Sequence, residues 1–404
     1  MHPFSITENI SELNFLLEQK DISKASRKML DLTKEFDLPQ EIELLAHEVR
    51  IHHNSLQTET QLVDEVVVEK CKYFLAYIEQ HKEQFESFIQ QIDHGTSTVY
   101  YAKGISKRFW SGNSPFYLQP SDLELRTGQI TGVVGENGNG KTTLLRIVAG
   151  ELMSDTGEIT YPLLSLKAGQ WYDIKNQIAF IPQRLSKWHG TLLDNLRFYA
   201  NIHGIKEEEN EKQVAYILHR LGLDKFKHLK WSEISSGYRL RFELAKMLMR
   251  RPKLLVLDEP LANLDINAQQ LFLQDLKFII KSIRYPLSII LSSQALHEIE
   301  SVADNIIFIK QGQTIYSGSQ KAFGQDRKVN TFEVSGNFTR EQLVQVMQLI
   351  PGSKIEDSGT IYFISVPTDF SAEEFLQTLI MNKIPLTYYR DISFSTRKLF
   401  KKDF

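Results

Sequence analysis

The stretch from Ile234 to Asp265 reads ISSGYRLRFELAKMLMRRPKLLVLDEPLANLD and decides the fold. Its first serine pair and glycine form a typical helix start, in which Ser235 can cap the backbone N–H groups that follow. A helix with a row of leucines comes next, and an apolar strand then ends in Asp258 and Glu259, 23 and 24 residues after Ser235. Helix, strand and paired carboxylates in this order predict an α/β domain with acidic groups at a sheet edge.

A second stretch, GENGNGKT from Gly135 to Thr142, follows a predicted strand over Gln129–Val134 and precedes an apolar helix. That context is the one a phosphate-binding loop requires. Glycines let backbone N–H groups turn inward around phosphate oxygens, and the helix N-terminus adds its dipole. The expected nucleotide contacts are Asn137, Gly138, Gly140, Lys141, Thr142 and Thr143.

The chemistry expected of this loop depends on its charged and hydroxyl side chains. Lys141 places a positive charge on the β and γ phosphates, and the Thr142 hydroxyl can ligate Mg²⁺. Asp258 ends its strand at the same edge of the sheet, where its carboxylate can hold Mg²⁺. Glu259, one residue further on, is expected to face the γ-phosphate, where it can polarise an attacking water. The sequence therefore predicts an ATP site with Mg²⁺.

Composition limits the other possibilities. The 404 residues suggest two or three domains, and 42% hydrophobic residues suffice for packed cores. A formal net charge of −3 gives no sign of a nucleic-acid partner. One cysteine excludes a disulfide framework and fits a reducing compartment. No signal peptide pattern opens the chain, and its apolar runs are shorter than the roughly 18 residues of a membrane span.

The first part of the chain, residues 1–95, predicts only helices. Ser5 opens a capping-box pattern, and apolar residues spaced by three and four predict a second helix over Ile22–Phe36. Pro39 suits the first turn of a third helix, and Gln61–Gln91 holds one long helix or two shorter ones. Without a repeat, a small bundle is favoured. The turn-rich segment Asp93–Thr98 is the predicted linker.

Residues 99–320 alternate short strands with helices, which predicts a parallel sheet. The expected strands are Gln129–Val134, Gln177–Ile181, Lys253–Asp258, Ser288–Ser292 and Asn305–Lys310. The expected helices are Thr142–Gly150, Leu192–Ile202, Gln213–Leu221, Gly237–Arg250 and Ala268–Lys281. Residues 330–404 predict a small α+β domain of the split βαβ kind, with the elements Thr331–Val334, Arg340–Leu349, Gly359–Val366, Ala372–Met381 and Leu386–Phe394.

These motifs, in this order, resemble those of an ABC-type ATPase. The matching segments are GENGNGKT, Ala179–Gln183, Ser235–Arg239, LLVLDEP and Leu261–Asp265, and the resemblance covers about residues 99–318. It implies a P-loop NTPase of the ABC nucleotide-binding type, flanked by the N-terminal helical bundle and the C-terminal α+β domain.

In that family two nucleotide-binding domains meet head to tail around two ATP molecules. The resemblance implies that Ser235 and Gly237 contact the γ-phosphate across the dimer. Gln183 would reach Mg²⁺ and the attacking water, and Asp265 would couple the two sites. The second domain would come from another copy of this chain or from a related ATPase subunit.

An aromatic residue about 25 residues before the phosphate loop usually stacks on adenine in this family. Phe109 fits that position, while Trp110 and Tyr101 are nearby alternatives.

The chain departs from the family pattern at two places. The signature normally reads Leu-Ser-Gly-Gly-Gln, and here Ile234–Tyr238 keeps the serine and Gly237 but ends in Tyr238. The larger departure is Gln294, which occupies the position of a histidine that contacts the γ-phosphate. A glutamine amide can donate a hydrogen bond but cannot carry a proton or a positive charge. We therefore hypothesise slower hydrolysis with ATP binding retained.

Thr191–Leu196, Phe198–Gly204 and Leu291–Glu300 resemble the ATPase subunits of ABC-2 exporters. That likeness implies a separate membrane permease docked near Gln183, against a helical insertion at about 184–231, with this subunit on the cytoplasmic face. Two alternatives stay open, a soluble ABC ATPase without a transport role and a slow nucleotide-dependent scaffold. The N-terminal bundle could dock a partner, regulate the ATPase or stabilise it. The transported substrate is not encoded in this chain.

Overall fold

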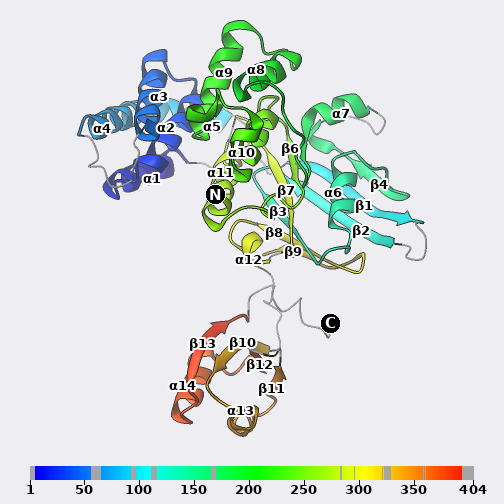
Figure 1. Cartoon of the computed structure of the whole chain (residues 1–404). Helices are drawn as coiled ribbons and strands as arrows, with labels where there is room; N and C mark the ends of the chain where they lie inside the picture. The colour runs from blue at the N-terminus through cyan, green and yellow to red at the C-terminus, as the bar shows by residue number, and fades with distance from the viewer. Residues whose placement is uncertain are drawn as a thin grey trace. The chain divides into compact units, whose positions relative to one another are not determined.

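The computed structural model describes residues 5–55, 65–91, 97–110, 116–164, 170–282, 284–294, 296–320, 322, 329–357, 359 and 361–393. The chain divides into two compact units (Figure 1). One comprises Met1–Gln294 with Ile309–Ile315, and the other comprises Ala295–Phe308 with Tyr316–Phe404. The predicted linker Asp93–Thr98 lies largely outside the described residues. Among the described residues, no helix has both the length and the apolarity needed to cross a bilayer.

The N-terminal segment forms the predicted helical bundle. The sequence left Gln61–Gln91 open, and the structure places two helices there. Ser5 caps the first helix and Asp21 caps the second, each accepting a backbone N–H three residues on. The helices bury a common apolar core that includes the cysteine, Cys71. Their bounds are α1 Ile6–Glu18, α2 Ile22–Phe36, α3 Gln40–Ser55, α4 Glu65–Gln80 and α5 Lys82–Gln91.

Residues 99–320, the predicted nucleotide-binding region, contain a six-stranded sheet with the order β5-β6-β7-β3-β8-β9. The neighbouring pairs β5–β6, β6–β7 and β3–β7 are parallel, which confirms the predicted parallel sheet. β6 and β7 are buried along their whole length, and the continuous apolar run of β6 fits a sheet covered on both faces. The strands are β3 Ile130–Val134, β5 Ile178–Ile181, β6 Leu254–Leu257, β7 Ser288–Ser293, β8 Asn305–Lys310 and β9 Gln313–Ser319.

A second sheet, antiparallel and three-stranded, was not predicted. Its order is β2-β1-β4, with β1 Thr98–Phe109, β2 Phe116–Arg126 and β4 Thr156–Thr160. β1 pairs with β2 so that Phe109 faces Phe116. Polar and charged residues alternate with buried ones along both long strands, and bulges interrupt the β1 pairing. The sheet therefore lacks the continuous apolar runs that revealed the parallel strands.

Helices join the parallel strands as expected. α8 matches its predicted bounds, whereas α9 begins six residues before the predicted Gln213, with three glutamates in its first turn.

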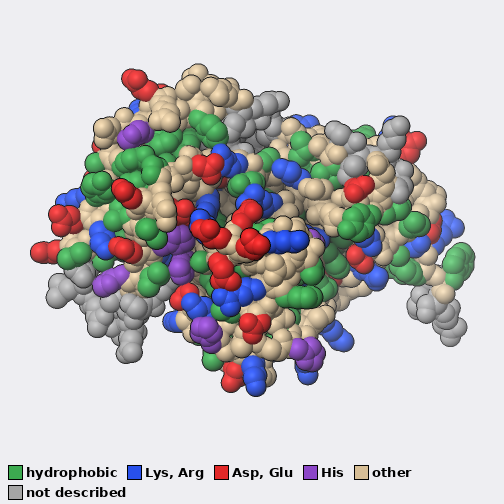
Figure 2. Space-filling view, turned by 90° about the horizontal axis from the view of Figure 1, so that it is seen from above, with side chains coloured by type: hydrophobic (Ala, Val, Ile, Leu, Met, Phe, Trp, Pro, Cys, Tyr) green, Lys and Arg blue, Asp and Glu red, His purple; other side chains and the backbone are tan. Residues whose placement is uncertain are grey.

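In the space-filling view, side chains of both charge signs are interspersed on the visible face (Figure 2). Surface pairs on α8 and α9 include Arg197 with Glu211 at 2.6 Å. The remaining elements of this region are α6 Lys141–Val148, η1 Pro162–Leu164, α7 Trp171–Gln177, α8 Leu192–Ile202, α9 Glu207–Arg220, η2 Asp224–Phe226, η3 Trp231–Glu233, α10 Ser236–Leu248, α11 Ile266–Ile279 and α12 Leu296–Glu300.

The C-terminal domain has the split βαβ arrangement, with the strand order β11-β12-β10-β13 and antiparallel neighbours throughout. The sequence predicted three strands, and the structure has a fourth, Lys354–Asp357. That strand lies at the sheet edge and is largely exposed, so its sequence carries little apolar signal. The other elements are β10 Val329–Gly336, α13 Arg340–Met347, β12 Tyr362–Pro367, α14 Ala372–Met381 and β13 Leu386–Asp391.

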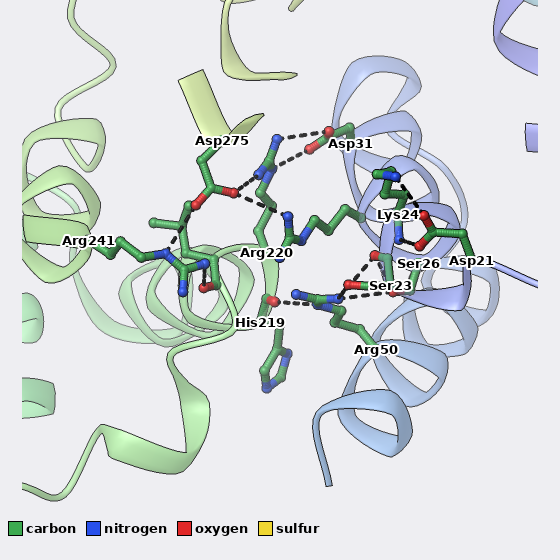
Figure 3. A network of polar contacts seen from close by, with 12 residues as sticks. Asp21, Ser23, Lys24, Ser26, Asp31, Arg50, His219, Arg220, Arg241 and Asp275 are labelled. Carbon is green, nitrogen blue, oxygen red and sulfur yellow. Dashed lines mark hydrogen bonds and ion pairs between the residues drawn. The ribbon is translucent and has the colours of Figure 1, made fainter. Parts of the chain in front are cut away.

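A buried group of charges joins the bundle to the nucleotide-binding region (Figure 3). Asp275 of α11 is fully buried and receives three guanidinium groups. Its partners are Arg27 at 3.5 Å, Arg220 at 3.4 Å and Arg241 at 3.1 Å. Arg220 also pairs with Asp31 of α2 at 2.8 Å. These contacts give Asp275 three cationic partners and Arg220 two anionic ones in place of water.

A histidine pair lies at the same interface. His47 of α3 and His219 of α9 face each other with 2.7 Å between their Nδ1 atoms. Burial, and then the neighbouring His219, lower the pKa of His47 to about 4. The His47 ring is therefore neutral at pH 7, which leaves one nitrogen lone pair for the shared hydrogen bond.

Replacing Asp275 with alanine would leave three buried guanidinium groups without this carboxylate. We expect the free energy of unfolding to fall by about 3–5 kcal/mol, because one side of a buried ion cluster is left uncompensated. Urea unfolding followed by circular dichroism measures this loss. Glu211→Gln is the matched surface control and should cost less than about 1 kcal/mol. Equal losses for the two variants would contradict the burial argument.

Candidate functional site: a phosphate-binding loop at the sheet edge

The loop between β3 and α6 folds around the ammonium group of Lys141. Lys141 is 3% exposed, and its ammonium group donates to the carbonyls of Gly135 at 2.8 Å and Glu136 at 3.2 Å. Asn137 and Gly138 are exposed at the tip of the loop. Because α6 begins at Lys141, its first N–H groups, including those of Thr142 and Thr143, lie where a phosphate would bind.

Two glycines of the loop cannot be replaced without rearrangement. Gly140 has φ +101°, and a Cβ there would lie 2.6 Å from Cζ of Phe116. A Cβ at Gly135 would lie 2.3 Å from the carbonyl oxygen of Ile309. Asn139 turns inward and accepts from the backbone N–H of Gln311 at 3.0 Å. The loop is therefore backed closely by its neighbours, which fixes its shape.

Asp258 follows β6 and is 4% exposed. Its Oδ1 accepts hydrogen bonds from the hydroxyl of Thr142 at 3.2 Å and from that of Ser292 at 2.9 Å. The Ser292 hydroxyl in turn accepts the backbone N–H of Glu259 at 2.9 Å. The structure thus brings the predicted pair Thr142 and Asp258 together. It adds Ser292, a fully buried residue that the sequence reasoning missed although it stands two residues before Gln294.

Glu259 is the point at which the predicted catalytic side chains meet. Its Oε1 lies 3.1 Å from Nζ of Lys141. Its Oε2 accepts from the amides of Gln183 at 2.9 Å and Gln294 at 2.8 Å. Glu259 also has φ +44°, a left-handed conformation that is strained for a residue with a side chain. One carboxylate therefore joins the phosphate loop, the end of β5 and the end of β7.

The predicted signature residues start α10. Ser235 caps the helix by accepting the N–H of Tyr238 at 3.5 Å. A Cβ on Gly237 would lie 3.1 Å from that of Ala268, so the glycine permits a close approach of α10 to α11. The Tyr238 ring packs on Phe226 with 4.0 Å between the ring centroids. The tyrosine that departs from the family pattern thus has a structural partner in the helical insertion.

Asp265 caps α11 and accepts the N–H of Ala268 at 2.9 Å. It is exposed. Because Gly237 also contacts Ala268, the starts of α10 and α11 are held against each other at this residue.

A groove of about 900 Å³ lies between the Gln183 segment and the start of α10. Gln183 and Glu259 line it together with Ser236 and two tryptophans. Trp188 and Trp231 stack with 4.9 Å between their ring centroids, and the indole N–H of Trp188 donates to Glu243 of α10 at 2.9 Å. The sequence reasoning did not find this tryptophan pair, because the two residues are 43 positions apart in the sequence.

The adenine candidates differ in position. Phe109 is 38% exposed at the end of β1, and its ring centroid is 6.4 Å from that of Phe116. Since Phe116 lies against Gly140, the end of β1 is close to the phosphate loop. Trp110 follows directly and is 83% exposed. Tyr101 is eight residues earlier, about 25 Å away along an extended strand. This distance favours the Phe109 end of the strand over Tyr101 as the position of the adenine-stacking residue.

The parallel sheet, the glycine loop and the buried carboxylate pair define a P-loop nucleotide-binding domain. A family model described as "ABC transporter" matches residues 118–262. The chain is similar to the following ABC transporter relatives over about half of its length. An uncharacterized ABC transporter ATP-binding protein of Methanocaldococcus jannaschii is 30% identical over 202 residues, 50% of this chain and 71% of the relative. A probable sulfate/thiosulfate import ATP-binding protein of Chlorella vulgaris is 31% identical, with coverage of 57% and 94%. NatA, an ABC transporter ATP-binding protein of Bacillus subtilis, is 27% identical, with coverage of 51% and 83%.

Among solved structures, the cbiO1 protein of Clostridium perfringens, part of a cbiONQ ABC transporter complex, superimposes with a TM-score of 0.50 at 23% identity. The match covers 55% of this chain and 88% of that one, and it shows the shared fold. The chain belongs to the family of ABC transporter ATP-binding proteins. It is the ATP-binding ATPase subunit of a transporter, which confirms the predicted family, fold class and enzyme type.

Ser292→Ala tests the bridge between the two carboxylates. The change leaves the buried N–H of Glu259 without its acceptor, so we expect a stability loss of about 1–3 kcal/mol and a lower ATPase rate. Ser288→Ala on the same strand is the matched control, since the Ser288 hydroxyl is buried without a hydrogen-bond partner. That control should keep both its stability and its rate. Denaturant unfolding and phosphate release measure the two effects, and identical behaviour of the variants would contradict the bridge.

Proposed function

We propose that this subunit dimerises around two ATP molecules and hydrolyses them to drive a separate membrane permease, in the direction of export. The observation that carries the proposal is the convergence of Lys141, Gln183 and Gln294 on the Glu259 carboxylate. A carboxylate held among a cation and two amides, one residue after Asp258, is placed to act on water beside a γ-phosphate. The Ala179–Gln183 and Leu291–Gln294 segments supply the two amides.

In the proposed reaction Glu259 is the general base. Its charge is balanced by Lys141, and a bound phosphate would offer that lysine a stronger anionic partner. The lysine would then hold the β and γ phosphates, and the Glu259 carboxylate would accept a proton from water. The amides of Gln183 and Gln294 orient that carboxylate, because both donate to its Oε2. Phe109 is proposed to stack on the adenine.

The donor set fits Mg²⁺, because Thr142 and Asp258 present a hydroxyl and a carboxylate oxygen 3.2 Å apart and this ion prefers oxygen ligands. Thr142 and Asp258 would hold the ion, and the side-chain oxygen of Gln183 would join them. When bound, Mg²⁺ neutralises negative charge on the phosphates.

The proposed dimer places Ser235, Gly237 and Tyr238 of one copy over the phosphate loop of the other. The helix start of α10 is an anion site by its N–H groups and dipole. The serine hydroxyl adds a hydrogen-bonding group, and Gly237 leaves the backbone open. Asp265 would couple the two sites through the start of α11. The partner is a second copy of this chain or a related ATPase subunit.

We assign the permease to the groove beside Gln183, with the subunit on the cytoplasmic face of the membrane. The helical insertion at about 184–231 borders this groove. The separate apolar cores of the first and last segments support a division into domains at 1–95, 99–320 and 330–404. The export direction rests on the likeness to ABC-2 subunits. A polytopic membrane protein that co-purifies from detergent-solubilised membranes would support transport over a scaffold role.

Glu259→Gln tests the reaction and the dimer together. We expect ATP binding to persist, hydrolysis to fall by at least about 100-fold, and the ATP-bound variant to run as a dimer. Phosphate release and light scattering after size exclusion measure these outcomes. Glu136→Gln, which changes an exposed carboxylate in the phosphate loop, should behave as the parent. A variant that hydrolyses normally, or stays monomeric with ATP, would refute the proposal.

Gln294→His tests the slow-hydrolysis hypothesis. The imidazole can carry a proton and a positive charge, so we expect kcat to rise by up to about tenfold, equivalent to roughly 1.4 kcal/mol of transition-state stabilisation. Gln294→Ala removes the amide that holds Glu259 and should lower kcat. Steady-state kinetics at saturating ATP separates the variants. A histidine variant no faster than the parent would count against the hypothesis.

A further inference from the structure

The buried charge cluster has one carboxylate at its centre, that of Asp275 (Figure 3). Three elements send a guanidinium group to it, namely α2 through Arg27, α9 through Arg220 and α10 through Arg241. Because Asp275 itself belongs to α11, a single side chain ties the N-terminal bundle to three helices of the nucleotide-binding region.

The bundle contributes charges of both signs to this cluster. Besides Arg27, α2 carries Asp31, which pairs with Arg220 through both of its oxygens, at 2.8 and 3.2 Å. Arg241 also donates to the carbonyl of Leu221, just after α9. The positions of α9 and α10 are therefore set by groups that α2 partly supplies.

Arg50 of α3 also binds the C-terminal end of α9 and α2 at this interface. It is 1% exposed, and its Nε donates to the carbonyl of His219 at 2.9 Å. Its Nη1 donates to the carbonyl of Ser23 at 3.1 Å. The C-terminal end of α9 is thus held by both α2 and α3.

The two helices joined at Asp275 also begin at the proposed functional residues. Arg241 lies six residues after the Ser235 cap, about 9 Å along α10. Asp275 lies ten residues after the Asp265 cap, about 15 Å along α11. At their starts the helices meet again where Gly237 approaches Ala268. Two contacts along a helix pair fix their relative angle, which a single contact would not.

Buried ion pairs at this interface between the bundle and α9, α10 and α11 favour one arrangement of the helices over others. An apolar interface can slide with little loss, whereas separating a buried guanidinium from its carboxylate strands a charge away from water. A shift of α10 or α11 against the bundle would therefore be resisted until every charge found a new partner. The charge cluster around Asp275 therefore favours one arrangement of the starts of α10 and α11.

We propose that the N-terminal bundle positions the signature end of the ATPase, with Arg27 and Asp31 acting through Asp275 and Arg220. It holds Ser235 and Asp265 in the relation that the ATP-bound dimer requires. The inference rests on the proposed function, in which these residues act across the dimer. Arg27 and Asp31 are positioning residues, since they contact neither the nucleotide loop nor the Glu259 carboxylate.

The experiment measures the ATPase rate of the full chain against protein concentration. For the parent, the concentration at half-maximal specific rate reports dimer formation. Arg27→Met should raise that concentration between about 2-fold and 30-fold, the range for a coupling residue. The ATP affinity of the monomer, measured at low protein concentration, should stay unchanged. Arg27→Lys keeps the buried charge, so its concentration at half-maximal specific rate should be close to that of the parent.

Two controls separate positioning from stability. Lys28→Met removes the neighbouring buried cation, whose partner Glu12 lies within the bundle, and should leave both readouts unchanged. Leu13→Ala weakens the bundle core without touching the cluster, so it should lower the unfolding midpoint and leave the concentration dependence unchanged. If Arg27→Met does not fold, Asp31→Asn replaces it with the same expected direction.

The outcomes distinguish the two proposals. If the specific ATPase rate of the parent does not depend on protein concentration, the dimeric site is refuted, regardless of the result for Arg27→Met. A parent that shows this dependence while Arg27→Met matches it refutes the positioning role. An effect shared equally by Leu13→Ala, or a parallel loss of ATP affinity in the monomer, also overturns it.

Discussion

The hydrogen bond from the Ser292 hydroxyl to Asp258 is the interaction on which the site depends. It exists because β7 lies between β6 and β3 in parallel register, so that Leu257 aligns with Leu291 and Val134 with Ser293. All three strands therefore end at one edge. The phosphate loop, the carboxylate pair and the Gln294 segment follow those ends and meet without further chain rearrangement.

This register also brings together the charges of the site. Asp258 and Glu259 are both buried, and Lys141 pairs with Glu259. Asp258 is stabilised by two hydroxyl donors, whereas Glu259 takes the lysine and two amides. The two neighbouring carboxylates thus have different surroundings. One is suited to hold a cation, and the other to accept a proton from water.

The sequence predicted the parallel strands and the loop because both carry dense local signals. β8 and α8 match their expected bounds, and buried runs such as β6 leave little choice of structure. The antiparallel sheet of β1, β2 and β4 was missed because its alternating polar residues and bulges carry no such run. Ser292, Phe116 and the Trp188–Trp231 pair were missed for another reason. Their roles arise from partners distant in sequence, which no local pattern records.

The bundle interface illustrates the same limit. Arg27, Arg220, Arg241 and Asp275 appear in the sequence as ordinary helix charges, yet all four are at least 95% buried. Burying them would cost more than an apolar interface unless each found a partner. An interface built only for stability needs no such cluster, since leucines in its place would serve as well or better. The charged cluster instead specifies one arrangement of α10 and α11. This gives it a purpose beyond stability, because the arrangement of these helices sets the positions of Ser235 and Asp265.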